Sequence, residues 1–206
     1  MILGIDTSTG ACSVALFGAG GELLAERHEV IGRGHAEQLV PMVEEVLEGH
    51  IPSQILVGIG PGSFTGIRVG IAAAQGMAIG WGVPVHGLSS LALIAANATA
   101  LQYEGGQVAA AMIGGHGELF VQSFTMPKLS PIGDHQSLAP PAAARVVDAP
   151  LVLGPAAETL VEERRAGQAE VCHPRAAHAL LLPHALRTLP LRPLYGRAPD
   201  AKPKAA

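Results

Sequence analysis

A strand-to-helix turn near the middle of the N-terminal half reads Gly60-Pro61-Gly62-Ser63-Phe64-Thr65-Gly66 and continues into Ile67-Arg68-Val69-Gly70-Ile71-Ala72. A short β-branched stretch at 55–59 precedes the turn and predicts a strand. Pro61 fixes its φ angle, the glycines permit conformations that other residues avoid, and Ser63 can cap a following helix. The sequence therefore predicts a rigid turn that leads into a helix over residues 64–82.

The N-terminal half predicts three strands followed by alternating helices and strands. Alternating or continuous apolar runs predict the strands, and apolar residues at helical spacing predict an amphipathic helix in which Pro41 removes one hydrogen bond. The predicted elements are, in chain order, strands at 2–7, 12–18 and 23–30, a helix at 35–48, a strand at 55–59, a helix at 64–82, a strand at 83–86 and a helix at 89–98.

From Gln107 onward the pattern returns to strands. Strands at 108–113 and 118–125 flank the turn Gly114–Gly117, and a strand at 151–153 precedes a helix at 155–165 that has proline at its first position. The segment 128–148 is rich in Pro, Ala and polar residues and predicts irregular structure. The tail from Pro190 contains four prolines and predicts disorder after about Arg197.

Composition and charge exclude several classes of protein. A chain of 206 residues with 49% apolar and 15% charged residues predicts a folded core. The net charge of -4 and the scattered arginines disfavour independent nucleic-acid binding, which usually needs a basic face. Charged and turn-forming residues interrupt the apolar stretch 67–100, so a membrane span is not expected. The N-terminus lacks a signal-peptide pattern, and we expect a cytoplasmic protein.

The sequence offers no self-sufficient catalytic constellation. A Walker loop, a Gly-x-Ser-x-Gly elbow, HExxH and CxxC are all missing from it, and the two cysteines lie far apart. The nine histidines lack metal-ligand spacing and are interpreted as structural or surface residues. We therefore predict neither a catalytic side chain nor a metal site.

A polar loop, Asp6-Thr7-Ser8-Thr9, falls between the first two predicted strands. The aspartate of such a loop can hold a hydrated magnesium ion, while hydroxyls and backbone amides contact phosphate oxygens. The same four side chains can instead satisfy the hydrogen bonds of a tight turn. The loop is a candidate phosphate site, and both interpretations stay open.

Small residues recur at every fourth position of the helix predicted at 64–82. Such a ridge lets another backbone approach closely, and glycine inside a helix costs about 1 kcal/mol relative to alanine, so an offsetting contact is expected. The ridge either packs on the chain's own sheet or, with the apolar stripe of the helix at 35–48, docks a partner. The candidate interface residues are Leu39, Val43, Val46, Leu47, Gly66, Gly70, Ala74 and Ala78.

Four motifs in residues 1–99 follow in the order found in the TsaB (YeaZ) family, and the chain resembles that family. They are Asp6–Thr9, Gly34–Pro41, Gly60–Gly66 and Val85–Leu91, to which the C-terminal Pro193–Arg197 adds a weaker match. The resemblance implies an α/β actin-like ATPase and sugar-kinase fold (ASKHA, ribonuclease H-like), with two similar lobes of which the C-terminal one is reduced. It places the N-terminal lobe at 1–99, the smaller lobe at 100–197 and a disordered tail at 198–206. The linker at 49–55 is shorter than usual, and the segment 112–120 departs from the family pattern.

The resemblance also implies a function in tRNA modification. The family's catalytic paralogue, TsaD, carries two metal-binding histidines where this chain has Ser90 and Ile94, which lack the imidazole nitrogens of such a site. The chain therefore resembles a non-catalytic scaffold subunit of the complex that makes N6-threonylcarbamoyladenosine (t6A37). The implied partners are a TsaD-like catalytic subunit and a TsaE-like ATPase, with a homodimer when the chain is alone and tRNA bound only through the complex.

The resemblance implies no cofactor for the chain alone, and ATP with magnesium only within the complex. An alternative function is an active small-molecule phosphotransferase of the actin-like fold that uses Asp6 and magnesium. That enzyme would need a complete adenosine pocket in residues 107–206, for which no glycine-rich strand-to-helix turn is recognisable. A peptidase is a third interpretation, but the chain supplies neither a nucleophile and base pair nor a zinc site.

Overall fold

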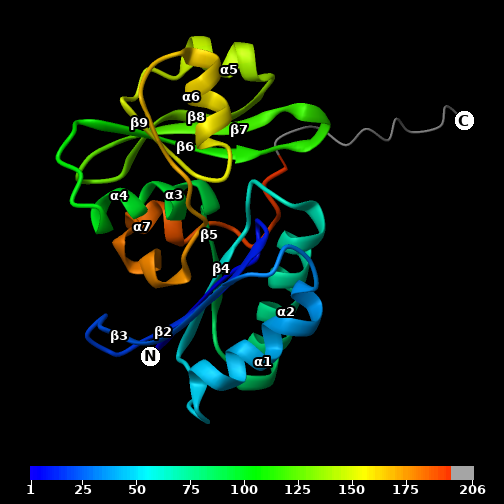
Figure 1. Cartoon of the computed structure of the whole chain (residues 1–206). Coiled ribbons are helices and arrows are strands. Elements are labelled where there is room, and N and C mark those ends of the chain that lie inside the picture. The colour runs from blue at the N-terminus through cyan, green and yellow to red at the C-terminus, as the bar shows by residue number, and fades with distance from the viewer. Residues whose placement is uncertain (196–206) are drawn as a thin grey trace, which may run out of the picture.

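The computed structural model describes residues 1–195 and has an α/β fold with two mixed five-stranded sheets (Figure 1). The α/β class predicted from the sequence is confirmed. The predicted disorder after Arg197, including the tail at 198–206, lies outside the described residues. None of the helices within residues 1–195 is both long and apolar enough to cross a membrane.

The first sheet has the strand order β3-β2-β1-β4-β5. Its strands are β1 (Ile2–Asp6), β2 (Ala11–Phe17), β3 (Leu23–Val30), β4 (Gln54–Gly58) and β5 (Val85–Leu88). The first three pair antiparallel, which confirms the predicted meander, and β4 and β5 continue the sheet in parallel. The loops after β1 and β4 therefore lie next to each other at one edge of the sheet.

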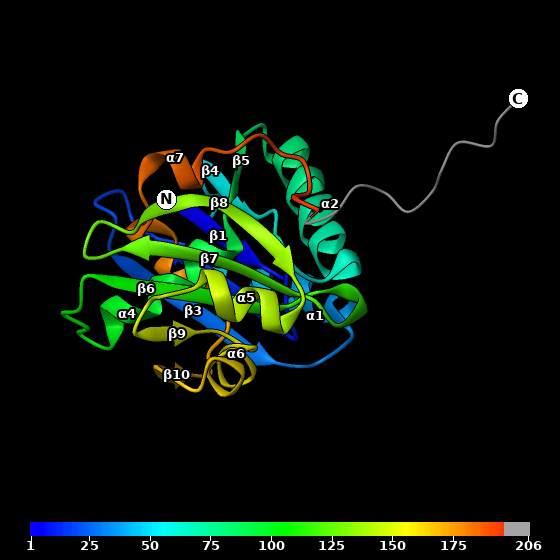
Figure 2. The same ribbon diagram turned by 90° about the horizontal axis from the view of Figure 1, so that it is seen from above.

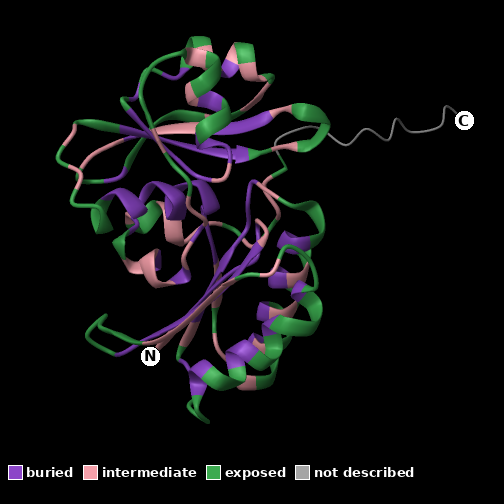
Figure 3. Cartoon of the chain, viewed as in Figure 1, coloured by how far each residue is buried: buried purple, intermediate pink, exposed green. Residues whose placement is uncertain are grey.

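Two helices, α1 (His35–Leu47) and α2 (Phe64–Trp81), cover one face of the first sheet. The side chain of Ser63 accepts a hydrogen bond from the Gly66 amide, as the sequence predicts for a cap. Gly82 ends α2 with a φ of 67°, in the left-handed region that favours glycine. Figure 3 shows that both helices turn a buried side toward the sheet and an exposed side outward.

The second sheet has the order β10-β9-β6-β7-β8. Its strands are β6 (Gln107–Ile113), β7 (Leu119–Thr125), β8 (Ser130–Leu138), β9 (Leu151–Leu153) and β10 (Gln168–Glu170), with a 3₁₀ turn, η1 (Gly115–Gly117), between β6 and β7. The β6–β7 hairpin confirms the prediction for this region. Seen from above, α5 (Pro140–Val146) and α6 (Ala157–Arg164) lie on the outer face of this sheet (Figure 2).

The prediction of irregular structure for residues 128–148 is wrong. This segment forms β8, which pairs antiparallel with β7 at the edge of the second sheet, and then α5. Most side chains of β8 are exposed, so the strand lacks the apolar alternation that would have predicted it. Prolines at the first positions of α5 suit a helix start, because the amides there have no partner within the helix.

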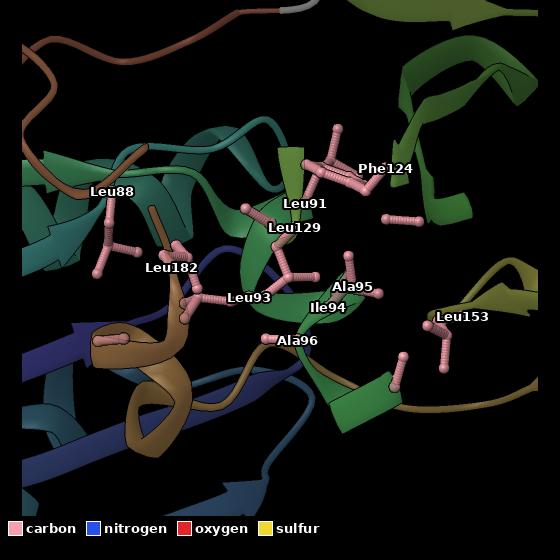
Figure 4. Packing of buried hydrophobic residues seen from close by; sticks show 14 of the residues in the cluster. Leu88, Leu91, Leu93, Ile94, Ala95, Ala96, Phe124, Leu129, Leu153 and Leu182 are labelled. Atoms are coloured by element: carbon pink, nitrogen blue, oxygen red, sulfur yellow. The ribbon is translucent and has the colours of Figure 1, made fainter. Parts of the chain in front are cut away.

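The space between the sheets is filled by short helices and apolar side chains. The helices are α3 (Ser90–Ala95), α4 (Asn97–Ala100), the 3₁₀ helix η2 (Ala176–Leu181) and α7 (His184–Arg187). Figure 4 shows side chains from α3 in contact range of both sheets, with Leu88 on one side and Phe124 and Leu153 on the other. This central core joins the two sheets.

The C-terminal segment returns to the first sheet. Leu189 pairs with Gly87 beside β5, and the Leu194 amide donates a 2.8 Å hydrogen bond to the Ile59 carbonyl. The far end of the described chain thus lies against the turn 60–66. The predicted division into lobes at 1–99 and 100–197 stays a prediction.

Candidate functional site

Asp6, at the end of β1, is enclosed in the protein and fully hydrogen-bonded. It is 1% exposed, its Oδ1 accepts bonds from the Ser8 amide (2.9 Å) and hydroxyl (2.7 Å), and its Oδ2 accepts one from the Ser90 hydroxyl (2.7 Å). Burial raises the pKa of Asp6, and the hydrogen bonds from Ser90 and Ser8 oppose that rise. The carboxyl group thereby ties β1 to the start of α3.

The other members of the loop 6–9 also make turn hydrogen bonds. The Thr7 hydroxyl donates to the Gly66 carbonyl (2.7 Å), and the Ser63 amide donates to the Ser8 carbonyl (2.7 Å). The Thr9 hydroxyl accepts from the Ala11 amide (3.2 Å) and lies 3.0 Å from Nδ1 of His173. The structure thus joins the loop 6–9 to the turn 60–66, two motifs that are far apart in the sequence.

A cleft of about 780 Å³ lies beside this junction, between the two sheets. The residues that line it include Ser8, Thr9, Ser63, Phe64, Arg68, Met112, Glu118, Phe120, His173 and Tyr195. At its rim, the guanidinium of Arg68 lies 3.6 Å from the ring centre of Phe64, and its Nε donates to the Tyr195 hydroxyl (3.0 Å). The volume lies within the range of small-molecule sites.

The described cleft residues offer little positive charge for a magnesium-bound polyphosphate. Among the described residues that line it, Arg68 is the one Lys or Arg, and its guanidinium is already engaged. Asp6, the predicted magnesium ligand, is turned toward Ser8 and Ser90 and does not line the cleft. Within residues 1–195, no three His, Cys, Asp or Glu side chains gather closely enough to hold a metal ion.

The structure buries all eight candidate interface residues in the monomer. Leu39, Val43, Val46, Leu47, Ala74 and Ala78 belong to the core beneath α1 and α2, and Gly66 and Gly70 lie against the loop 6–9. A Cβ atom at Gly66 would lie 2.0 Å from the Thr7 carbonyl oxygen, and one at Gly70 would lie 2.5 Å from the Thr7 hydroxyl. Of the two interpretations of this ridge, packing on the chain's own sheet is the one that the structure bears out.

A second row of small residues lies on the solvent side of α2 and was missed from the sequence. Ala72, Gly76 and Gly80 are exposed, and a Cβ atom at either glycine would meet nothing within 4 Å. Ile79 beside them is 84% exposed, and Val40 on α1 is 51% exposed. We call these five residues the outer helical face. The four-residue spacing of Ala72, Gly76 and Gly80 was the signal that could have revealed it.

Asp6→Ala is expected to lower the free energy of unfolding by about 2–3 kcal/mol, because buried donors of Ser8 and Ser90 would lose their acceptor. Asp6→Asn keeps an acceptor oxygen, and we expect a loss of about 1 kcal/mol. Urea unfolding of both variants measures the difference. Equal losses would show that the hydrogen bonds of Asp6 are not what stabilises this junction.

Known proteins resemble this chain in both sequence and structure. A family model described as TsaD, tRNA N6-adenosine threonylcarbamoyltransferase, matches residues 27–178. The structure of YeaZ from Pseudomonas aeruginosa is 31% identical to this chain, with a TM-score of 0.75 over 88% of this chain and 89% of that one. The chain belongs to the TsaB (YeaZ) family. The family predicted from the four N-terminal motifs is thereby confirmed.

Further members support the assignment to the TsaB (YeaZ) family. A crystal structure described as similar to peptidase YeaZ from Pseudomonas aeruginosa is 30% identical, with a TM-score of 0.79 over 95% of this chain and 99% of that one. TsaB of Escherichia coli is 42% identical over 102 residues, which cover 47% of this chain and 43% of that protein. TsaB of Haemophilus influenzae is 40% identical over 114 residues, which cover 53% and 48%. The chain spans about half the length of the curated relatives it matches.

Proposed function

We propose that this chain is the non-catalytic TsaB-type subunit of the t6A37 machinery and acts by binding a TsaD-like catalytic subunit. The observation that carries the proposal is the similarity to YeaZ over almost the whole chain, together with the TsaB name of the curated relatives. Ser90 and Ile94, at the positions of the TsaD metal ligands, are both fully buried, and Ser90 is bonded to Asp6. These two side chains favour a structural role over metal catalysis.

The outer helical face is the proposed docking surface for the TsaD-like subunit. Its small residues let a partner helix approach closely, and Ile79 supplies an exposed apolar side chain for burial in a complex. The eight interface residues expected from the sequence form the core beneath this face and hold α1 and α2 in place. Glu37 and Glu44 of α1 and Glu48, which directly follows it, are exposed, so we expect basic residues on the opposing surface.

The remaining partners follow from the same proposal. A TsaE-like ATPase joins the assembly, tRNA is bound only through the complex, and the outer helical face supports a homodimer when the TsaD-like subunit is missing. The chain needs no cofactor of its own, ATP with magnesium enters only within the complex, and the proposed location is the cytoplasm. We also propose that the two sheets and the cleft between them form the two lobes of an actin-like fold.

An active phosphotransferase is the alternative, and the cleft volume is its main support. Two observations tell against it. Asp6 is enclosed by hydrogen bonds, and the described cleft residues offer little positive charge for a polyphosphate. In the scaffold proposal, the loop 6–9 stabilises the fold and does not bind phosphate.

Co-purification and sedimentation with the host's TsaD-like subunit test the proposal. We expect a stable heterodimer that weakens as salt concentration rises, because the acidic residues of α1 face basic ones on the partner. A mixture that sediments as separate species at micromolar concentration would overturn the docking proposal. ATP turnover by the purified chain alone, abolished by Asp6→Asn in a folded protein, would favour the phosphotransferase.

A further inference from the structure

A cluster of one acidic and four basic side chains lies between β3 and the segment that follows the second sheet. We call residues 172–182 the latch segment; it includes η2, which packs against β1, β2 and β3. Arg175 in this segment forms two hydrogen bonds with the carboxylate of Glu26, from Nε (3.0 Å) and from Nη2 (2.7 Å). The other members of the cluster are His28, His173 and His178.

Strand register explains how the cluster forms. Ser13 of β2 is opposite His28, and Ala15 is opposite Glu26, so these side chains share one face of the first sheet. The Ser13 hydroxyl accepts a 2.9 Å hydrogen bond from the Ala176 amide, which fixes the latch segment on that face. His173 at the start of the segment contacts Thr9 and lines the cleft. The latch segment therefore connects the cluster to the loop 6–9.

The surroundings of the cluster lower the pKa values of its three histidines. Burial and the charge of Arg175 lower the pKa values of His28 and His178, and burial lowers the pKa of His173. The Nδ1 atoms of His28 and His178 are buried without a hydrogen-bond partner. Protonation of His28 at Nδ1 would place a buried N–H group where the structure offers no acceptor, whereas the backbone of Leu93 provides a hydrogen-bond partner for the charged form of His178.

Few other charges on the packed elements could compensate. On β3, the groups that face His28 are Glu26 and, from the latch segment, Arg175, His173 and His178. Helix α3 and the covered face of β2 carry no ionisable side chain, and Asp6 of β1 is enclosed by Ser8 and Ser90. Glu170, just before the latch segment, acts on Cys172. Glu26 is thus the carboxylate that acts on His28 and His178, and Arg175 already occupies both of its oxygens.

We propose that this cluster is an acid-sensitive latch, in which protonation of His28, His173 and His178 releases residues 172–182 from the first sheet. Three imidazolium groups and Arg175 would then face one carboxylate, and their repulsion opposes the docking of η2. Release also frees Thr9 and removes His173 from the lining of the cleft. The inference goes beyond the proposed scaffold function and does not depend on it.

The sign of the pH dependence follows from the lowered pKa values. The unfolded or released segment binds protons at higher pH than the docked segment does, so acid favours release. Docking is fully stable above the ordinary histidine pKa of 6.5 and is lost as the pH falls below that value toward the lower pKa values of the docked state. Release should therefore take up protons, with three per chain as the upper limit.

Amide exchange of the whole protein, followed by NMR from pH 7.5 to 5.5 and corrected for intrinsic exchange rates, tests the latch. We expect the protection of the Ala176 amide to fall at least tenfold, while the Ile71 amide within α2 changes little. The double variant His28→Gln/His178→Gln removes two of the titrating groups and should reduce the fall to less than threefold. His50→Gln, at an exposed site after α1, is the matched control and should behave like the wild type.

Two results would overturn the latch. One is unchanged protection of Ala176 in the wild type across this pH range. The other is a fall of the same size in the double variant. If the double variant does not fold, the titration of histidine ring resonances in the wild type decides: midpoints for His28, His173 and His178 at or above that of His50 contradict the proposal.

Discussion

Gly66→Ala is expected to lower the free energy of unfolding by about 4 kcal/mol or more, among the largest effects of any single substitution in this chain. The added Cβ atom would lie 2.0 Å from the Thr7 carbonyl oxygen, and backbone on both sides must shift to make room. The Gly66 carbonyl also accepts a hydrogen bond from the Thr7 hydroxyl, and the Gly66 amide donates one to the side chain of the helix cap Ser63. The shift would therefore disrupt the junction of the loop 6–9 with the turn 60–66. Urea unfolding monitored by circular dichroism measures the loss.

Gly76→Ala in the same helix is the matched control. Its Cβ atom meets nothing within 4 Å, so we expect the variant to be more stable than the wild type by about 0.5–1 kcal/mol, because alanine is the better helix former. A loss below about 1 kcal/mol for Gly66→Ala would mean that the contact with Thr7 is easily relaxed. The tight packing assigned to this junction would then be incorrect.

Ile79→Glu is expected to weaken binding to the TsaD-like subunit by more than about 100-fold, which corresponds to about 2.7 kcal/mol. Ile79 is 84% exposed in the monomer, so the substitution should leave the fold intact. In the proposed complex the carboxylate would be buried in an apolar contact without a partner, which is unfavourable. Titration calorimetry with the purified partner measures the change.

Ile132→Glu on β8 places the same charge at an exposed isoleucine of the second sheet, away from α1 and α2. This control should bind the partner as the wild type does. Normal binding by a folded Ile79→Glu variant would remove the outer helical face from the interface. Equal weakening by both variants would point to a general effect of charge.

The order of most strands and helices could be predicted because local sequence patterns determine it. Alternating strands, the glycine turn and the Ser63 cap each have a mechanism that works within a few residues. The strand β8 escaped prediction because an edge strand with exposed side chains shows no apolar alternation. Its position is fixed by pairing with β7, which is a tertiary effect.

The side of α2 that faces a partner could not be chosen from the sequence. The row from Gly66 to Ala78 and the row from Ala72 to Gly80 have the same spacing, and an offset of two residues places them on opposite sides of the helix. A helix that is apolar or small all round gives no preferred direction. A charge at Val43, which is 3% exposed, would consequently disturb the core and not a docking surface.

Contacts between segments that are distant in the sequence could not be predicted either. Glu26 and Arg175 lie 149 positions apart, and Asp6 and Ser90 lie 84 apart. Each pair depends on how the second sheet returns the chain to the first. No periodic pattern encodes such a return, so the enclosure of Asp6 and the histidine cluster emerged only from the structure.

Mass spectrometry of tRNA nucleosides from cells depleted of this protein tests its TsaB-type function most directly. We expect N6-threonylcarbamoyladenosine to fall on depletion, to recover when the wild type or Ile132→Glu is supplied, and to stay low with Ile79→Glu despite normal protein levels. An unchanged amount of the modified nucleoside in depleted cells would contradict the assignment of this chain to the t6A37 machinery.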